Sequence, residues 1–486
     1  MATYTSGSPA SLQSLTAELK QHYMEASKME NVMLEGGPLL NQLLERADET
    51  FGGANMPIPI VYSGGGGVSS NFSVAAAGAN PASLIGFQLT RASLFGVGLI
   101  NGEAMETTEG SEDAMIDALA LELDVRKRRV AQALGSYIFG DGTGVMGQVS
   151  STQTITNTTL ILEDPATAVN FFKGDWVQIS ATPGSAAHTT GTNATLGTTA
   201  GCAQIINVTY TGPNAGQITL TGVAGSTTPV ALNTIWSQIS NSEGPGGAGS
   251  VIYLAGDNVS TGQGSSVIPY NGANSAVVQG LLAWCPIGGP ASSGDNFFGV
   301  NRYQNSFAYG NVIDATAAGL NLGSIREALT LAVSQLHQVS AKPDLIVLNP
   351  VAFYNLSLSL QSQNTFPATG STGGDDGMFG FATLKMPTPH GTLEVVSDPR
   401  CAPYINVTSL AGAANTYSGA MTAFILETDT LGLFSKGPIP HVFEKDIGNW
   451  FIRLQTADQV QFQLKAYPAL ASRAPNHMAV VLLPNG

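Results

Sequence analysis

A strictly alternating segment near the C-terminus is the feature that most constrains how this chain folds. From residue 460 to residue 466 apolar and polar side chains take turns, in the order Val460, Gln461, Phe462, Gln463, Leu464, Lys465, Ala466. Because successive side chains of a strand point to opposite faces, this pattern predicts a strand with one buried face and one polar face. A turn marked by proline follows, and the apolar run Met478–Leu483 predicts a buried final strand. None of these side chains is nucleophilic or binds metal, so the segment indicates structure and not chemistry.

The low charge content narrows the class of protein. Charged residues make up 11% of the 486 residues, well below the roughly 25% of typical soluble domains. The hydrophobic fraction of 43% is enough for ordinary cores and excludes global disorder. Such a chain either hides much of its surface against copies of itself or is a secreted β-rich protein. The net charge of −15 indicates that tight phosphate binding is not its main role.

Cysteine usage and hydropathy exclude further classes. Cys202, Cys285 and Cys401 are odd in number and widely spaced, which argues against a disulfide scaffold and against a structural zinc site. The N-terminus lacks the basic and apolar regions of a signal peptide, and no apolar run reaches the roughly 18 residues that span a membrane. We therefore expect a protein made in a cytoplasm, with room for roughly three domains.

The first hundred residues predict an arm and a long excursion. Residues 1–55 contain helical pieces, one marked by Leu12, Leu15 and Leu19 and one beginning at Pro38, and their apolar stripes must be buried elsewhere. Residues 56–107 hold an extended segment, four glycines at 64–67 and a strand expected from Leu84 to Ile100. A lone hairpin is marginally stable in water, so this one needs a neighbouring subunit. Its glycines indicate a flexible tip.

The most regular helix is predicted at residues 111–138. Ser111 is its expected N-cap, and its apolar stripe is formed by Met115, Leu119 and Leu123. Glu122 with Arg126, and Asp124 with Arg128, are expected to form ion pairs at i,i+4. The basic run at residues 126–129 could contact nucleic-acid phosphates, but salt bridges and complementation of the helix dipole are the favoured interpretation.

Residues 150–290 have almost no helical pattern and predict a small β-barrel or sandwich, inserted for surface display. Strands are expected within Phe171–Ile179, Ala203–Tyr210 and Gly216–Gly222.

A mixed pattern begins near residue 300. The capping box at Ser324 and Glu327 opens a helix whose apolar face holds Ile325, Leu329, Val333 and Leu336. Residues 344–349 predict a buried strand, and Asn349 followed by Pro350 predicts the start of another helix. A Gly-rich loop at residues 368–377 and β-hairpin material up to Leu433 follow.

Motifs that carry chemistry are sparse. Gly142-x-Gly144-x-x-Gly147 matches a dinucleotide fingerprint, but it follows a helix and precedes a strand, so a tight turn is the favoured interpretation. Asp375–Asp376 lies in a Gly-rich loop and is interpreted as solvated. The histidines are unclustered and are interpreted as satisfied or exposed side chains, at positions His22, His188, His337, His390, His441 and His477. We therefore predict no enzyme, with no catalytic residues, no cofactor and no metal site.

The order of these elements resembles the tailed-bacteriophage major capsid proteins of the Hong Kong 97 type. Gln132–Gly144 is similar to the end of the family's spine helix, Pro343–Tyr354 to its axial-domain strand and short helix, and Phe443–Trp450 to the return into the peripheral domain. The resemblance covers residues 1–149 and about 296–486. It implies an α+β fold of the Hong Kong 97 type that carries an inserted all-β domain.

The resemblance also implies a domain division. We expect an N-terminal arm at 1–55, an extended loop at 56–107, a peripheral domain at 108–149 and 431–486, an inserted β-rich domain at 150–295 and an axial domain at 296–430. Within the peripheral domain, Val460–Ala466 should form a sheet that packs on Met115, Leu119 and Leu123.

Function follows from the resemblance. Family members self-assemble into pentamers and hexamers of an icosahedral head around double-stranded DNA, which an acidic shell would contact only non-specifically. The implied partners are further copies of the chain, a portal, and possible separate scaffolding and cement proteins, with no membrane. The implied location is the virion, after assembly in the bacterial host cytoplasm. Two alternatives stay open: an encapsulin-like nanocompartment shell protein, and a secreted β-rich glycan-binding protein.

Overall fold

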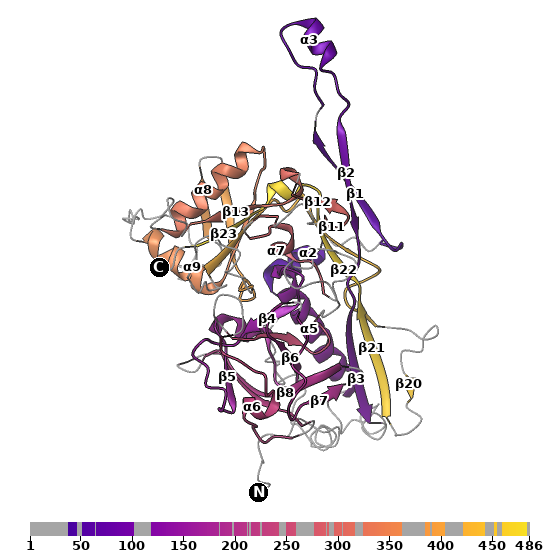
Figure 1. Cartoon of the computed structure of the whole chain (residues 1–486), viewed down its shortest axis with the longest axis vertical. Helices are drawn as coiled ribbons and strands as arrows, with labels where there is room; N and C mark the ends of the chain where they lie inside the picture. The colour runs from indigo at the N-terminus through magenta and orange to yellow at the C-terminus, as the bar shows by residue number, and fades with distance from the viewer. Residues whose placement is uncertain are drawn as a thin grey trace, which may run out of the picture.

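Figure 1 shows the computed structural model of the chain, in which a long β-hairpin projects from a body of helices and sheets. The structure describes residues 37–45, 51–63, 65–101, 118–183, 185–196, 199–210, 212, 215–223, 226–242, 249–258, 277–287, 289–290, 296–303, 305–315, 324–361, 384–388, 391–403, 421–442, 452–453 and 459–483. The predictions for Leu12–Leu19, Ser111, Met115, the Gly-rich loop with Asp375–Asp376, His22, His390 and residues 443–450 lie outside these ranges.

The projecting hairpin pairs β1 (Met56–Ser63) with β2 (Ser83–Leu89) and carries α3 (Phe72–Ala77) at its tip. The strand predicted from Leu84 to Ile100 is wrong in extent, because it is two strands of different sheets. After β2 the chain turns where the Ala92 N–H donates to the Pro468 carbonyl (3.0 Å) and Arg91 Nη1 donates to the Phe51 carbonyl (2.7 Å). It then continues as β3 (Leu94–Asn101).

The alternating segment forms β21 (Gln459–Ala466), and its burial alternates as predicted. β21 pairs with β3 on one edge and with β19 (His441–Val442) and β20 (Ile452–Arg453) on the other. β3 contributes Gly98, where an added Cβ would lie 2.1 Å from the Phe462 ring, and Gly96, where it would lie 2.9 Å from Val130. These glycines let the sheet pack closely on the long helix at Val130. Of the stripe predicted for this contact, Leu123 is partly buried, and the side chains of Met115 and Leu119 lie outside the described part of the chain. The predicted packing of the stripe on this sheet stays a prediction.

That long helix is α5 (Ala118–Phe139). Arg126 pairs with Glu122 (3.5 Å) and Arg128 with Asp124 (3.1 Å), which confirms both predicted ion pairs. Beside it lies α2 (Pro38–Glu45), which begins at its proline as predicted and buries Leu39, Leu40 and Leu43.

The segment after α5 forms a small barrel, which confirms a β-rich structure there. Antiparallel neighbours follow the order β4-β10-β6-β8-β9-β5, with β7 beside β8. The sheet closes where Val149 bridges Leu162 and the Glu163 N–H donates to the Gln148 carbonyl (2.9 Å). The elements are β4 (Val145–Gln148), β5 (Thr159–Ile161), η2 (Pro165–Asn170), β6 (Trp176–Ser180), β7 (Ala194–Leu196), β8 (Thr199–Thr209), β9 (Gln217–Thr221), α6 (Leu232–Ile235) and β10 (Val251–Leu254). β4 precedes the expected start of the insertion at residue 150.

A six-stranded mixed sheet has the order β13-β23-β17-β14-β16-β15. Its strands are β13 (Asn311–Asp314), β14 (Leu345–Leu348), β15 (Leu384–Thr388), β16 (Gly391–Ser397), β17 (Thr422–Leu426) and β23 (Ala479–Leu482). One face is covered by α8 (Ile325–Gln338) and α9 (Pro350–Gln361). As predicted, Ser324 Oγ accepts the Glu327 N–H (3.3 Å), and Asn349 Oδ1 accepts the Val351 N–H (3.1 Å).

The last strand differs from expectation. β23 lies between β13 and β17, in the six-stranded sheet and not in the sheet of β21. The expected assignment of all of residues 431–486 to one domain is therefore wrong for this strand. All four of its residues are buried, which suits a central strand covered on both faces. β22 (Pro468–Ser472) replaces the predicted turn and pairs with β18 (Leu431–Ser435).

The remaining described elements gather beneath the hairpin. They are α7 (Leu281–Trp284), β11 (Asn296–Phe297), β12 (Val300–Asn301), η4 (Ser306–Ala308) and η7 (Pro475–His477). One continuous core joins α2, the buried end of α5, the barrel and the root of the hairpin, and a second core lies between the six-stranded sheet and α8 with α9. Among the described helices, none has the length and apolar character needed to cross a membrane.

Candidate assembly surface

The distal half of the hairpin exposes apolar side chains to solvent, which is energetically unfavourable in an isolated monomer. Val61 and Leu84 face each other across the two strands and are 62% and 68% exposed. At the tip, Val68 is fully exposed and Phe72 is 87% exposed, and α3 buries none of its residues. The neighbouring pair Ile60 and Ile85, on the opposite face, is only partly buried. Several exposed large apolar side chains on one hairpin indicate an interaction site.

The charge pattern of this segment could have revealed the surface from the sequence, and our sequence reasoning missed it. No Asp, Glu, Lys or Arg occurs between Phe51 and Thr90. Charged residues are the usual means by which proteins keep an exposed ribbon soluble and unpaired. Their absence along 40 consecutive residues indicates a hairpin that is covered when the protein works.

The described glycines at the tip allow close backbone approach, and the flexible tip predicted from the sequence stays a prediction. An added Cβ would lie 2.2 Å from the Asn80 carbonyl oxygen at Gly65 and 2.4 Å from the Gly78 carbonyl oxygen at Gly66. The chain therefore needs these glycines for close backbone approach. Asn71 Oδ1 caps α3 by accepting the Ser73 N–H (3.0 Å). The tip thus presents Phe72 at the start of a capped helix.

An aromatic cluster fixes the root of the hairpin to the body. Phe87 on β2 meets Trp284 edge-on, with ring centroids 5.1 Å apart, and Trp284 meets Phe297 in the same manner at 4.9 Å. Trp284 Nε1 donates to the Leu470 carbonyl (3.1 Å), so its polar atom is satisfied. Phe298 adopts φ 48°, rare for a bulky residue, and its carbonyl accepts the Gln88 N–H (2.7 Å). The ring contacts and the bond from Gln88 to Phe298 anchor β2 at its base.

A second exposed apolar surface lies on α9. Val351, Tyr354 and Leu358 recur at helical spacing and are 52%, 60% and 44% exposed, while Ala352 and Leu356 on the other face are buried. A helix that is apolar on both faces is normally buried on both.

The basic run on α5 is engaged in protein contacts, as the favoured interpretation predicted. Beyond the two i,i+4 pairs, Arg129 Nε donates to Asp175 Oδ1 (3.1 Å), and its guanidinium lies 4.3 Å from the centre of the Phe172 ring. Three of the four basic residues are therefore paired within the described structure.

The buried face of α5 carries polar contacts to two other parts of the fold. Arg400 Nη1 donates to the Gln132 carbonyl (2.8 Å), and Ser136 Oγ donates to Asn170 Oδ1 (2.8 Å). Burial lowers the pKa of Arg400 to about 10, although Asp398 opposes the shift. Asp398 in turn accepts the Leu39 N–H (3.3 Å) at the start of α2. These bonds connect α5 with the barrel and with α2.

One carboxyl of this region is unusual. Tyr137 on α5 donates its hydroxyl hydrogen to Asp257, which follows β10 of the barrel. Burial raises the pKa of Asp257 to about 6, and the bond from Tyr137 opposes the shift only in part. Burial and the nearby Asp257 carboxyl raise the pKa of Tyr137 well above its usual value. Above about pH 6 this junction therefore holds a partly buried, ionised carboxylate.

Among the described residues, the side chains and motifs that could carry chemistry lie apart. Gly142 and Gly144 have φ of +84° and +82° and connect α5 to β4, as the tight-turn interpretation predicted. His477 Nδ1 lies 2.8 Å from Glu427, His188 is buried in the barrel, and the three cysteines are separately buried as free thiols. Among the described residues no group of three or more His, Cys, Asp or Glu side chains is placed to hold a metal ion.

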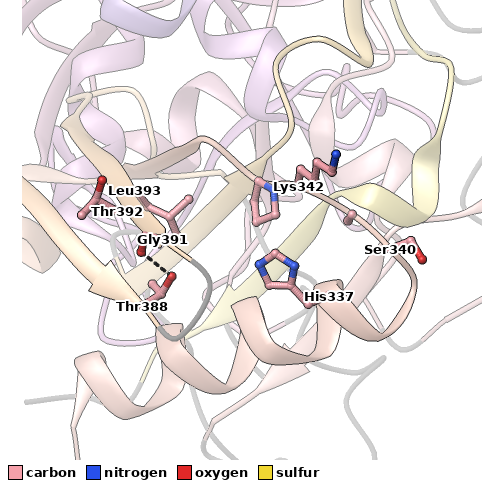
Figure 2. Close-up of a pocket in the computed structure, with 9 residues that line it drawn as sticks. His337, Ser340, Lys342, Thr388, Gly391, Thr392 and Leu393 are labelled. Atoms are coloured by element: carbon pink, nitrogen blue, oxygen red, sulfur yellow. Dashed lines mark hydrogen bonds between the residues drawn. The ribbon is translucent and has the colours of Figure 1, made fainter.

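One cavity of about 450 Å³ lies between the end of α8 and the β15–β16 turn (Figure 2). Its described lining includes His337, Ser340 and Lys342, but neither a carboxylate nor a thiol. Figure 2 shows the Ser340 hydroxyl pointing away from the His337 ring, so the two do not form a nucleophile–base pair. Thr388 Oγ1 donates to the Gly391 carbonyl (2.7 Å) and closes the turn. The described part of the lining therefore holds no paired nucleophile and base.

Comparisons with known proteins find similarity in fold but not in sequence. No protein-family model and no curated protein sequence matches the chain. Among solved structures, a chain of the capsid asymmetric unit of cyanophage A-1(L) superimposes with a TM-score of 0.51 at 10% identity, over 94% of this chain and 95% of that one. The protein therefore shares the fold of a phage capsid chain, which confirms the resemblance at the level of the fold.

Weaker likenesses extend to other particles. A Mycobacterium phage Ogopogo structure gives a TM-score of 0.41 at 12% identity, over 98% of this chain and 100% of that one. The holo-SrpI encapsulin complex of Synechococcus elongatus gives 0.40 at 7% identity, over 97% and 95%. At such scores neither likeness bears on the choice between a phage head and a nanocompartment.

Proposed function

We propose that this chain is the major capsid protein of a tailed phage and that it is a structural protein, not an enzyme. The observation that carries the proposal is the projecting hairpin, whose apolar, charge-free distal half is exposed in a chain with the fold of a phage capsid chain. Burying that surface against neighbouring copies would make stability collective, because the hydrophobic gain is realised only on assembly.

The finer features of the proposal come from the resemblance noted in the sequence. The chain would form pentamers and hexamers of an icosahedral head that encloses double-stranded DNA, after assembly in the host cytoplasm. Residues 1–55 would serve as an arm, 56–107 as the extended loop, 108–149 with β18 to β22 as the peripheral domain, 150–295 as an inserted domain, and 296–430 with β23 as the axial domain. A portal, separate scaffolding and cement proteins would be its partners.

The pairing of the α5 basic run supports weak, non-specific contact with DNA. Arg126, Arg128 and Arg129 already neutralise acidic partners, which leaves little uncompensated positive charge on the helix. The net charge of −15 favours a lining from which packed DNA can be released.

Light scattering and negative-stain microscopy of the purified full chain test the proposal. We expect capsomers or closed shells at micromolar concentration. A chain that stays monomeric at all concentrations would exclude both a phage head and a nanocompartment. Shells that form with cellular cargo proteins and without any DNA-packaging partner would favour the nanocompartment instead.

A further inference from the structure

The two long edges of the hairpin differ in their capacity to add a strand. Pro57 and Pro59 on β1 have no N–H, and they lie opposite Gln88 and Gly86. The backbone hydrogen bonds within the hairpin must therefore come from the pairs Ile58 with Phe87 and Ile60 with Ile85. The backbone N–H and C=O groups point away from the partner strand at the other positions, which are 57, 59 and 61 on β1 and 84, 86 and 88 on β2. The bond from the Gln88 N–H to Phe298, outside the hairpin, agrees with this geometry.

The edge of β1 is thus closed to strand addition, because two of its outward positions are prolines that cannot donate. The edge of β2 is open. Leu84 and Gly86 direct their N–H and C=O groups outward, and no described residue bonds to them. A Cβ added at Gly86 would meet nothing within 4 Å. One edge of the hairpin is blocked and the other is available.

We propose that a strand of a second copy of this chain adds to the outer edge of β2 when the protein assembles; the inference rests on the proposed shell function. Leu84 and its cross-strand neighbour Val61 would then be covered along with the backbone. Main-chain bonds would provide affinity and the apolar side chains would fix the register.

A second copy is the occupant that the charge pattern favours. The chain carries a net charge of −15, so two copies repel each other unless their contact is free of charge, and residues 51–90 contain no charged side chain. Binding of a basic partner would instead favour acidic residues along this edge. Figure 1 shows the distal hairpin standing clear of the described body, so the body of the same copy does not cover it.

Substitution at Gly86 separates the backbone from the side chain. Gly86→Pro removes the outward N–H, whereas Gly86→Ala keeps it and fills open space. We expect Gly86→Pro to raise the protein concentration needed for half-assembly by about tenfold or more, since a hydrogen bond and the fit of the added strand are both lost. Gly86→Ala should change it by less than about twofold. Assembly of Gly86→Pro at the wild-type concentration would overturn the inference.

Hydrogen exchange of the wild-type full chain gives a test that needs no variant. The outward amides of Leu84 and Gly86 should exchange freely in the dissociated chain and become protected on assembly. Protection already present in dissociated monomers, or no protection in assembled particles, would refute strand addition by a second copy. If the wild-type chain never assembles, the proposed function fails; if it assembles without protection at this edge, only the inference fails.

Discussion

Replacing Asp257 with asparagine should make the protein more stable at neutral pH and should remove part of the pH dependence of its free energy of unfolding. Burial raises the pKa of this carboxyl from 3.8 to about 6. Below pH 4 the group is protonated in folded and unfolded chains alike, and its contribution to stability is complete. Between about pH 4 and pH 6 the unfolded chain releases the proton while the folded chain retains it, so stability falls as pH rises, and above about pH 6 the loss is constant.

The size of the effect follows from the shift. A rise of about two pKa units corresponds to about 3 kcal/mol, since each unit represents about 1.4 kcal/mol. Asparagine cannot ionise, yet its carbonyl oxygen still accepts the hydrogen bond from Tyr137. Asp257→Asn should therefore raise the free energy of unfolding by up to about 3 kcal/mol at pH 8 and change it little at pH 4.

Urea unfolding of the full chain at pH 4, 6 and 8 measures the effect. Glu394→Gln is the matched control, because it removes a carboxylate at an exposed position of β16 and should leave the difference between pH 4 and pH 8 unchanged. An Asp257→Asn variant that is less stable than the wild type at pH 8, or that keeps the full pH dependence, would refute the reasoning.

Three further predictions address the hairpin and the C-terminus. Trp284→Ala should lower the free energy of unfolding by about 3–5 kcal/mol in urea, because the ring is fully buried at the hairpin root, whereas Tyr354→Ala, on an exposed face, should change it by less than about 0.5 kcal/mol. Gly66→Ala should impair assembly measured by light scattering while leaving urea unfolding of the body unchanged, since its Cβ would strike the Gly78 carbonyl; equal assembly of Gly66→Ala and the wild type would favour the flexible-tip view. Truncation after Pro440 removes β21, β22 and β23 and should yield no soluble, assembling chain by gel filtration, so particles formed by the truncated chain would contradict the sheet assignments.

Local signals in the sequence predicted the elements that local physics determines. Ser324 and Asn349 cap their helices through bonds within three residues, and the alternation of Val460–Ala466 follows directly from strand geometry. Such features depend on nearest neighbours along the chain, so a single sequence contains them.

Features that depend on distant partners were not predicted. Phe87 meets Trp284 and Phe297 at the hairpin root although about 200 residues separate it from them in the sequence, and no periodicity connects them. β22 was missed because Pro468 indicated a turn, although a proline at the first position of a strand costs no ladder bond. The close approach at the tip glycines was not predicted because flexibility and close backbone approach both favour glycine, and only the positions of Gly78 and Asn80 reveal the close approach.

Electron cryomicroscopy of particles formed by the purified full chain would show directly where the hairpin lies. We expect a closed shell in which the hairpin of each copy lies on a neighbouring copy, with Phe72 and Leu84 buried at the contact. Particles in which the hairpins stand free in solvent, or a preparation that contains only monomers, would contradict it.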